Sequence, residues 1–193
     1  FSGYASSLAV LSDTEKELGV VLVDIGAGTT DISIYTEGSV AYSSVLAIGA
    51  RHVTNDLAIG LRVSLESAEK IKIALSEEAE RKTKVKTEED TDQFDLSDLG
   101  VGEVKKVSKK TLVEGIIRPR LNEIFTMVRI ELEKASIINR IPSGVVVTGG
   151  GAQTVGTVES AKRMLSLPVR IGKPKGVGGL IDDVIAPAFS VPV

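Results

Sequence analysis

The sequence contains no cysteine and a single histidine, His52. Without thiols the chain forms no disulfide, offers no thiolate ligand to zinc and has no cysteine nucleophile. One histidine cannot build a metal centre from several imidazoles, and the absence of a Gly-x-Ser-x-Gly motif argues against a serine hydrolase. The sequence therefore excludes thiol-dependent sites and disfavours histidine-rich metal centres and Ser-His-Asp catalysis.

Long apolar runs and an excess of one charge are missing as well. No run approaches the roughly 20 apolar residues that a membrane-spanning helix needs, and Phe1 does not open a signal peptide. The net charge is −3, with 23 basic and 26 acidic residues, so no basic surface for nucleic acid is indicated. We therefore expect a cytoplasmic α/β protein without nucleic-acid binding. Because the chain lacks an initiator Met and stops at Val193, we also expect it to be part of a longer protein.

The 193 residues suffice for one domain or two small lobes, and folding should bury about 70% of the unfolded surface. Charge is concentrated in residues 76–110, which hold 18 of the 49 charged residues. Such a run is usually a solvated face. Because helical patterns flank this one, we interpret it as the exposed part of a small subdomain inserted into a larger one.

Apolar patterning predicts the strands. Residues 19–25 are almost continuously apolar, which is typical of a strand buried on both faces of a sheet. Strands over 31–36 and 39–48 follow after short turns, so the three should form a meander. Two further strands are predicted over 144–148 and 169–171.

Helical spacing predicts four helices, over 54–61, 64–80, 112–138 and 157–165. Thr54 and Ser64 are the expected N-caps of the first two, because their side chains can accept hydrogen bonds from helix N–H groups. Pro119 lies inside the third, where it implies a kink or a helix start.

The first of two glycine-rich loops reads Asp-Ile-Gly-Ala-Gly-Thr-Thr-Asp over residues 24–31. Gly26 and Gly28 have no Cβ atom, so backbone N–H groups can come close to phosphate oxygens. Thr29 and Thr30 add hydroxyl donors. This composition favours a phosphate site.

Acidic residues flank this loop. Asp24, at the end of the first strand, can hold Mg²⁺ through its water shell, because magnesium gives up its waters reluctantly. The competing interpretation is an ordinary glycine hairpin turn. The threonines and the flanking Asp24 and Asp31 favour phosphate binding over that turn.

The second loop, residues 148–153, reads Thr-Gly-Gly-Gly-Ala-Gln and joins a predicted strand to a helix. A nucleotide can lie there against bare backbone and helix N–H groups. A Rossmann dinucleotide site is the competitor, but Thr154 stands where that fingerprint needs its third glycine, and no βαβ unit with a ribose-binding acid follows. The two loops in this order are a stronger signal than either alone.

In this order the loops resemble the second half of an actin-family ATPase. Residues 24–31 resemble its second phosphate loop, residues 145–151 its adenosine motif, and residues 67–72 the helix whose Glu and Lys reach the ribose and adenine. The resemblance implies an α/β fold: half of an actin-like (ribonuclease H-like) ATPase, with a mixed β-sheet, flanking helices and an inserted small α+β subdomain. Actins, sugar kinases, DnaK-type chaperones and MreB share these marks.

Longer segments resemble one branch, the FtsA family of bacterial cell-division proteins. They are residues 5–11, 17–24, 48–58, 117–121 and 169–174. The resemblance is weakest at about 80–110. It implies that residues 1–64 and 139–193 form subdomain 2A, and that residues 65–138 form the inserted subdomain 2B.

The same resemblance implies ATP and Mg²⁺ as ligands, with Asp24 at the metal. The implied nucleotide-binding residues are Asp24, Gly26, Gly28, Thr29, Thr30, Glu69, Lys72, Gly149, Gly150 and Gln153. His52 would be a structural or capping histidine at a helix entry. No catalytic residue is assigned. Phosphoryl transfer needs the phosphates clamped from both sides, so we expect the chain alone to bind ATP weakly without turning it over.

Family members polymerise like actin, recruit the tubulin-like FtsZ through 2B, and reach the cytoplasmic face of the inner membrane through a C-terminal amphipathic helix that we expect this chain to lack. An acidic FtsZ tail would be attracted to basic residues of 2B. Arg118 and Arg120 are the implied contacts, near Lys105, Lys106, Lys109 and Lys110. The competing interpretation is that this charge only keeps the subdomain soluble.

Two alternatives stay open at this point. One is PilM, an FtsA-like component of type IV pilus assembly with a similar glycine loop. The other is half of a kinase or chaperone-type ATPase. The charged insertion shows no evident substrate pocket, which favours a filament-forming adaptor of the division machinery over an enzyme of small molecules.

Overall fold

The computed structural model describes residues 2–84, 92–96, 106–137 and 140–174. In chain order its elements are α1 (Ser2–Val10), α2 (Asp13–Leu18), β1 (Val20–Ile25), β2 (Thr30–Thr36), β3 (Ser39–Leu46), α3 (Ala50–Leu61), α4 (Leu65–Lys84), β4 (Gln93–Asp95), β5 (Lys106–Ser108), α5 (Lys109–Leu112), η2 (Val113–Ile117), α6 (Arg118–Lys134), β6 (Val145–Thr148), η4 (Gly150–Gln153), α7 (Thr157–Leu165) and β7 (Val169–Ile171). All the predicted strands and helices are present. Of the charged segment 76–110, residues 85–91 and 97–105, with Lys105, lie outside the described ranges.

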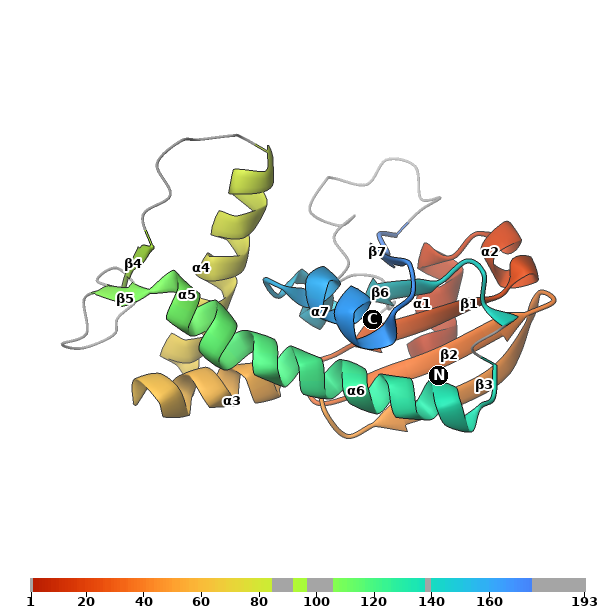
Figure 1. Ribbon diagram of the computed structural model, residues 1–193, viewed down its shortest axis with the longest axis horizontal. Coiled ribbons are helices and arrows are strands. Elements are labelled where there is room, and N and C mark those ends of the chain that lie inside the picture. Colours follow the sequence, from red (N-terminus) through yellow and green to blue (C-terminus); the bar gives the residue numbers. More distant parts are fainter. Residues whose placement is uncertain (1, 85–91, 97–105, 138–139, 175–193) are drawn as a thin grey trace.

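Five strands form one mixed sheet in the order β3-β2-β1-β6-β7. The antiparallel pairs β1–β2 and β2–β3 confirm the predicted meander, and the pairs β1–β6 and β6–β7 are parallel. β1 and β6 are buried along their whole length, as their continuous apolar sequences predict. Figure 1 shows this sheet on the right, with helices around it.

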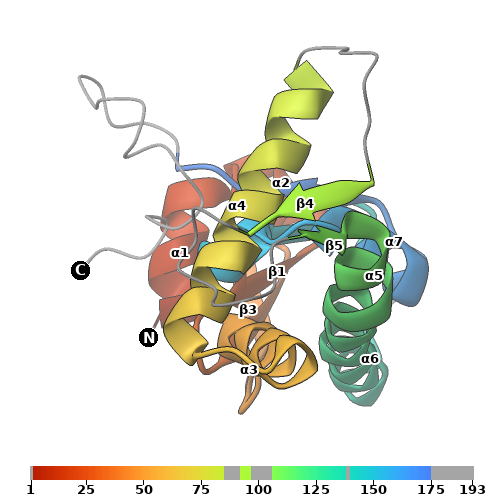
Figure 2. The same cartoon turned by 90° about the vertical axis from the view of Figure 1, so that its left-hand side faces the viewer.

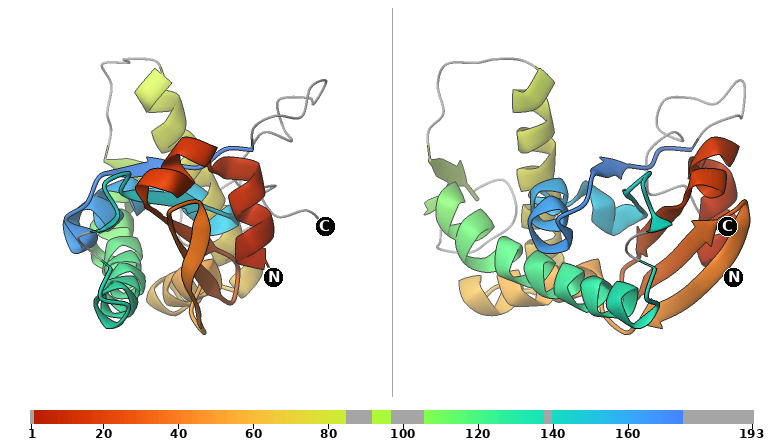
Figure 3. Two further views of the ribbon diagram at one scale, coloured as in Figure 1. Left: turned by 90° about the vertical axis from the view of Figure 1, so that its right-hand side faces the viewer. Right: turned by 45° about the vertical axis from the view of Figure 1, so that its right-hand side comes forward.

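Helices cover both faces of the sheet. On one face Val10 of α1 packs with Val20, Leu22 and Tyr35. The other face is covered by α6 and α7, whose buried residues join the alternate side chains of β1 in the main core. Figure 2 shows α1 and α6 on opposite sides of β1, and the left panel of Figure 3 shows the same arrangement from the other end. The end of β1, where the first glycine loop begins, is thus held between two helical layers.

The helix predicted over 112–138 consists of three consecutive pieces, α5, η2 and α6. η2 is a π-helix in which the N–H of Arg118 bonds back to the Val113 carbonyl oxygen, and α6 begins at Arg118 with a proline in its first turn. Pro119 has no N–H and its ring crowds the preceding turn, so the first turn of a helix is its favoured position. The change from π-helix to α-helix thus falls at the proline, but the backbone stays helical through this point, so no new helix begins there. The pieces form one long rod that runs from β5 to the sheet (Figure 1).

A second hydrophobic cluster lies apart from the sheet. Its fully buried members include Leu57 of α3, Ile71 of α4 and Leu112 of α5, and the small antiparallel sheet β4–β5 adds Phe94. α3 lies outside the range 65–138 assigned to the insertion, yet it supplies part of this cluster. The helix therefore connects the sheet to the second cluster.

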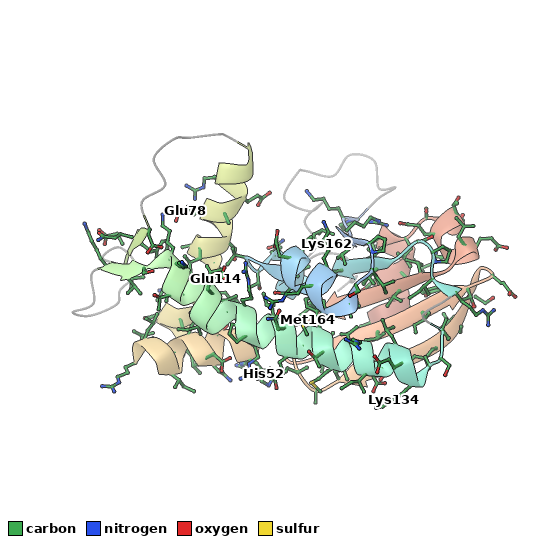
Figure 4. All side chains as sticks on the ribbon, in the orientation of Figure 1. His52, Glu78, Glu114, Lys134, Lys162 and Met164 are labelled. Atoms are coloured by element: carbon green, nitrogen blue, oxygen red, sulfur yellow. The ribbon has the colours of Figure 1, made fainter. Side chains whose placement is uncertain are left out.

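The cap of α3 differs from the prediction. The helix begins at Ala50, because the Gly49 N–H donates to Nδ1 of His52 at 3.1 Å and this pair caps the first turn. Thr54 is thus inside the helix, with its hydroxyl oxygen 3.4 Å from the Ala50 carbonyl oxygen. The proposed Thr54 cap was wrong, whereas the capping role of His52, labelled in Figure 4, is confirmed. The predicted cap of α4 is also confirmed, since Ser64 Oγ accepts the Ser67 N–H at 3.1 Å.

Candidate functional site

Two neighbouring strands bring the glycine loops together. β1 and β6 are parallel, with Asp24 opposite Thr148, so both strands end at the same edge of the sheet. A Cβ atom on Gly149 would stand 2.3 Å from Asp24 Oδ1 and 2.6 Å from the Ile25 carbonyl oxygen. Gly149 also has a φ of +84°. Glycine is therefore required there both for space and for backbone conformation.

The first loop is held by the N-terminus of α3. The Gly26 N–H donates to the Thr29 carbonyl oxygen at 2.9 Å, which closes a tight turn. The N–H groups of Ala50 and Arg51 donate to the carbonyl oxygens of Gly26 and Ala27 at 2.9 and 2.8 Å. The shape of the loop is thus set by the protein itself.

The two threonines of this loop have different surroundings. Thr29 is exposed, and its hydroxyl stands 3.5 Å from Asp31 Oδ2. Thr30 is fully buried, and its hydroxyl donates to the Ile48 carbonyl oxygen at 2.7 Å. Of the two hydroxyl groups expected to face a phosphate, only that of Thr29 lies at the surface.

Asp24 is a buried carboxylate, 4% exposed, on the face of β1 that α1 covers. Ser6 Oγ of α1 donates a hydrogen bond to its Oδ2. Burial raises the pKa of Asp24; the Ser6 hydrogen bond opposes this rise, and the charge of Asp31 adds to it. A nearby cation would favour the ionised carboxylate and so oppose the effects of burial and of the Asp31 charge on this pKa.

An open cleft of about 1840 Å³ lies between the loops and α4. Of the predicted nucleotide-binding residues, those that line it are Glu69, Lys72, Gly150 and Gln153. The others (Asp24, Gly26, Gly28, Thr29, Thr30 and Gly149) are not among its lining residues, although Ala27 of the first loop is. A Cβ atom built on Gly150 would meet no other atom within 4 Å, so the backbone is open there.

The α4 wall of the cleft carries a hydrogen-bonded group of three residues. The Lys72 ammonium, almost buried, donates to Thr54 Oγ1 at 3.0 Å and to Glu69 Oε2 at 2.9 Å, and the Thr54 hydroxyl donates to Glu69. Burial alone would raise the pKa of Glu69, but the hydrogen bonds from Lys72 and Thr54 outweigh it and the pKa is lowered. Sequence reasoning had missed Thr54 in this role.

The two arginines assigned to a partner surface point to different places. Arg118 lines the cleft, and its guanidinium pairs with Glu114 at 2.5 Å. Its Nε is buried and meets no acceptor among the residues that the structure describes. Arg120 instead bonds to Asp56 of α3. Figure 4 labels Glu114 on the part of the rod below α4.

The acidic groups suit a metal that arrives with its own ligands. Within residues 2–84, 92–96, 106–137 and 140–174, no three His, Asp or Glu side chains converge into a metal site. Mg²⁺ near Asp24 would need phosphate and water oxygens to complete its coordination, as is usual for magnesium bound with a nucleotide. The donor set fits that case and does not fit a metal held by protein alone. No helix in these ranges is long and apolar enough to cross a membrane.

Comparison with known proteins identifies the family. A family model described as "Cell division protein FtsA" matches residues 21–193. The chain belongs to the FtsA family. Its FtsA relative in Pseudomonas aeruginosa is 40% identical over 193 residues, and that in Neisseria meningitidis is 39% identical over 190 residues. Each match covers 98% of this chain and 44% of the relative, so the chain spans less than half the length of these FtsA proteins.

Solved structures confirm the actin-like fold. MreB5 of Spiroplasma citri bound to ADP matches with a TM-score of 0.65 and 21% identity, covering 89% of this chain and 54% of that one. A PilM–PilN type IV pilus biogenesis complex matches with a TM-score of 0.66 and 18% identity, covering 98% of this chain and 49% of that one. At these identities the likeness concerns fold alone. The FtsA match in sequence therefore decides against the PilM alternative and the kinase and chaperone alternatives.

Proposed function

We propose that this FtsA chain binds ATP with Mg²⁺ in the cleft and acts in bacterial cell division as part of an actin-like filament protein. The observation that carries the proposal is that the two glycine loops meet at the ends of β1 and β6, where Asp24 of the first strand lies against Gly149 of the second loop. Glu69 and Lys72 face these loops across the cleft. A structural neighbour of the same fold, MreB5, was solved with ADP bound.

Different residues of the cleft and its loops would contact different parts of the nucleotide. Backbone groups of the first loop and the Thr29 hydroxyl would receive phosphate oxygens, and the open backbone at Gly150 would lie along the nucleoside. Glu69 and Lys72 offer an acceptor and a donor to the ribose and base. The remaining contacts proposed are Gly26, Gly28, Thr30 through its backbone, Gly149 and Gln153.

Asp24 would hold Mg²⁺ through the water shell of the ion. When bound, Mg²⁺ neutralises phosphate charge. The chain spans less than half the length of its FtsA relatives. We propose that, in proteins of the full length of these relatives, residues outside the matched part contact the phosphates from the other side. The chain alone is then expected to bind ATP weakly and not to hydrolyse it.

The division role involves partners as well. We propose that residues 65–138 form subdomain 2B, which contacts the C-terminal tail of FtsZ, between the two parts of 2A, residues 1–64 and 139–193. In the whole protein we propose self-association into actin-like filaments and a location at the cytoplasmic face of the inner membrane at the division site. The second hydrophobic cluster, separate from the sheet, supports a subdomain of its own.

Arg118 and Arg120 are the proposed contacts for an acidic tail. Both guanidinium groups already have carboxylate neighbours, Glu114 and Asp56, at half-exposed positions. A tail carboxylate would add to or replace these pairs, which makes the expected binding weak and strongly dependent on salt.

The experiment that tests the nucleotide site is an ATP titration by calorimetry in the presence of Mg²⁺. Lys72→Met should weaken binding about tenfold, since it removes a charged donor from the cleft. The matched control is Lys70→Met on the same helix, which removes only an exposed ion pair with Glu66 and should leave affinity unchanged. Equal effects of the two substitutions, or ATP turnover that survives Asp24→Ala, would show that the cleft is assigned wrongly.

A further inference from the structure

Two carboxylates face each other at the phosphate loop. Asp24 on β1 and Asp31 on β2 are directly opposite in the antiparallel register, so their side chains share the face of the sheet that α1 covers. Like charges at directly opposite positions of an antiparallel pair repel and destabilise it. The arrangement therefore needs hydrogen-bond donors or a cation.

α1 supplies one donor to each of these carboxylates. Ser6 Oγ donates to Asp24 Oδ2, and Ser2 Oγ donates to Asp31 Oδ1 at 2.6 Å. The two serines are four residues apart, so they lie on the same face of the helix. A Cβ atom on Gly3 would stand 2.6 Å from Ser33 Oγ, so the helix lies against β2 closely enough for short hydroxyl groups to reach the acids.

The Ser6 hydrogen bond selects which carboxylate oxygen faces which side. Oδ2 is turned toward α1, and Oδ1 is turned toward Gly149 of the second loop, where a Cβ would stand only 2.3 Å away. A movement of the carboxylate away from α1 would break the hydrogen bond to Ser6. The carboxylate is thereby fixed between α1 and the nucleoside loop.

We propose that Ser6 is a positioning residue, which orients Asp24 toward the magnesium ion of a bound nucleotide and so ties α1 to the phosphate loop. This inference rests on the proposed Mg²⁺–ATP site. Ser6 itself is fully buried and touches neither the cleft nor the ligand in this role. It acts only through Asp24.

The neighbouring serine provides a matched control. Ser7 is on the same helix and equally buried, but its hydroxyl donates to the Tyr4 carbonyl oxygen and accepts from the Tyr35 hydroxyl. It makes no contact with Asp24 or Asp31. Ser6→Ala and Ser7→Ala thus each remove one buried hydroxyl group from α1, and only the first changes the loop carboxylate.

The experiment measures the ATP affinity of the chain with excess Mg²⁺ and again with EDTA. The ratio of the two affinities is then compared between the wild type and each variant. Ser6→Ala should lower the Mg²⁺-dependent gain in affinity about tenfold and leave the EDTA value unchanged. Ser7→Ala should leave the ratio at the wild-type value. In an Asp24→Asn background, Ser6→Ala should have no further effect on the ratio, because the two residues act as one unit.

The outcomes separate the two proposals. Loss of the Mg²⁺ effect in Asp24→Asn with a normal ratio in Ser6→Ala overturns the positioning role and leaves the nucleotide site standing. A wild-type chain without any Mg²⁺-dependent gain overturns both. A tenfold loss that persists in the Asp24→Asn background shows that Ser6 acts through the fold rather than through Asp24. Should Ser6→Ala fail to fold, Ser6→Cys keeps the branching of the side chain with a slightly larger and weaker donor, and is expected to give an intermediate ratio.

Discussion

Arg120 of α6 forms a bidentate pair with Asp56 of α3, in which Nε donates to Oδ2 at 2.6 Å and Nη2 donates to Oδ1 at 2.9 Å. Such two-pronged contacts between guanidinium and carboxylate are among the strongest side-chain pairs. The pair joins the long rod to the helix whose N-terminus holds the first glycine loop. It therefore contributes to the support of the proposed nucleotide site, in addition to any role of Arg120 toward a partner.

We expect Arg120→Ala and Asp56→Ala each to lower the free energy of unfolding by about 1–3 kcal/mol. The loss should be larger for Arg120→Ala, which removes the partner of Asp56, whereas Asp56→Ala leaves Arg120 paired with Glu123. The double variant should cost less than the sum, with a coupling energy of about 1 kcal/mol or more. Urea unfolding of the four proteins measures this cycle. Additive losses would mean that the pair contributes nothing beyond its separate side chains.

This pair also affects how partner binding is tested. Reversing the charge of Arg120 would disturb α3 as well as any contact with an FtsZ tail. Arg118 is the better position at which to test binding of the proposed FtsZ tail, although it also lines the cleft proposed for ATP. A loss of tail binding at Arg120 thus has meaning only when the unfolding free energy of the variant is measured beside it.

A second prediction concerns pH and Glu131. This nearly buried carboxylate accepts hydrogen bonds from Lys134 at 2.6 Å and from the Tyr42 hydroxyl at 2.7 Å, and these contacts, Lys134 first, lower its pKa to about 2. A depressed pKa means that the ionised form stabilises the fold. Its contribution is fully present above the ordinary pKa of 4.5 and is lost as pH falls toward 2. Figure 4 labels Lys134 at the far end of the rod.

Glu131→Gln should therefore remove about 2 kcal/mol of stability at neutral pH and much less at pH 2 to 3, since protonation has already discharged the wild-type side chain there. Thermal unfolding across that range measures the difference. Glu133→Gln is the control, because Glu133 makes only an exposed ion pair with Arg129. A constant gap between wild type and Glu131→Gln at every pH would contradict the assignment.

The strands and most helices were predictable because their apolar residues face the cores with the periods of strand and helix. α1 was not, for a physical reason. Its buried residues include Gly3, Ser6 and Ser7, whereas Tyr4 and Leu8 are more than half exposed. A helix that turns small and polar residues inward shows no amphipathic pattern. By contrast, α2 carried a readable signal that was overlooked, the capping box of Ser12 and Glu15.

The glycine loops of the candidate site could be predicted from the sequence, but the side chains that pack around these loops and line the cleft could not. Glycine loops after buried strands are visible in the sequence, and the structure places them side by side. The contacts of Thr54, Ser6 and Arg118 depend on how distant elements pack, which no local pattern shows. The same holds for Thr30, whose hydroxyl serves the Ile48 carbonyl oxygen inside the protein.

The third prediction contrasts two neighbouring glycines of the second loop. Gly149→Ala would place a Cβ atom 2.3 Å from Asp24 Oδ1 and 2.6 Å from the Ile25 carbonyl oxygen, at a φ of +84°. Both the clash and the left-handed backbone are unfavourable, so we expect a loss of about 2–4 kcal/mol in unfolding free energy. Gly150→Ala meets no atom within 4 Å, and its stability should stay within about 1 kcal/mol of wild type.

ATP titration of these two variants separates the support of the site from the site itself. Because Gly150 lines the cleft, a methyl group there should weaken ATP binding in a chain that is otherwise as stable as wild type. Gly149→Ala should lose affinity only together with stability, since it moves Asp24 and the strand end. A Gly150→Ala chain that binds ATP normally would place the nucleoside elsewhere. A stable Gly149→Ala chain would show that the two loops do not touch as described.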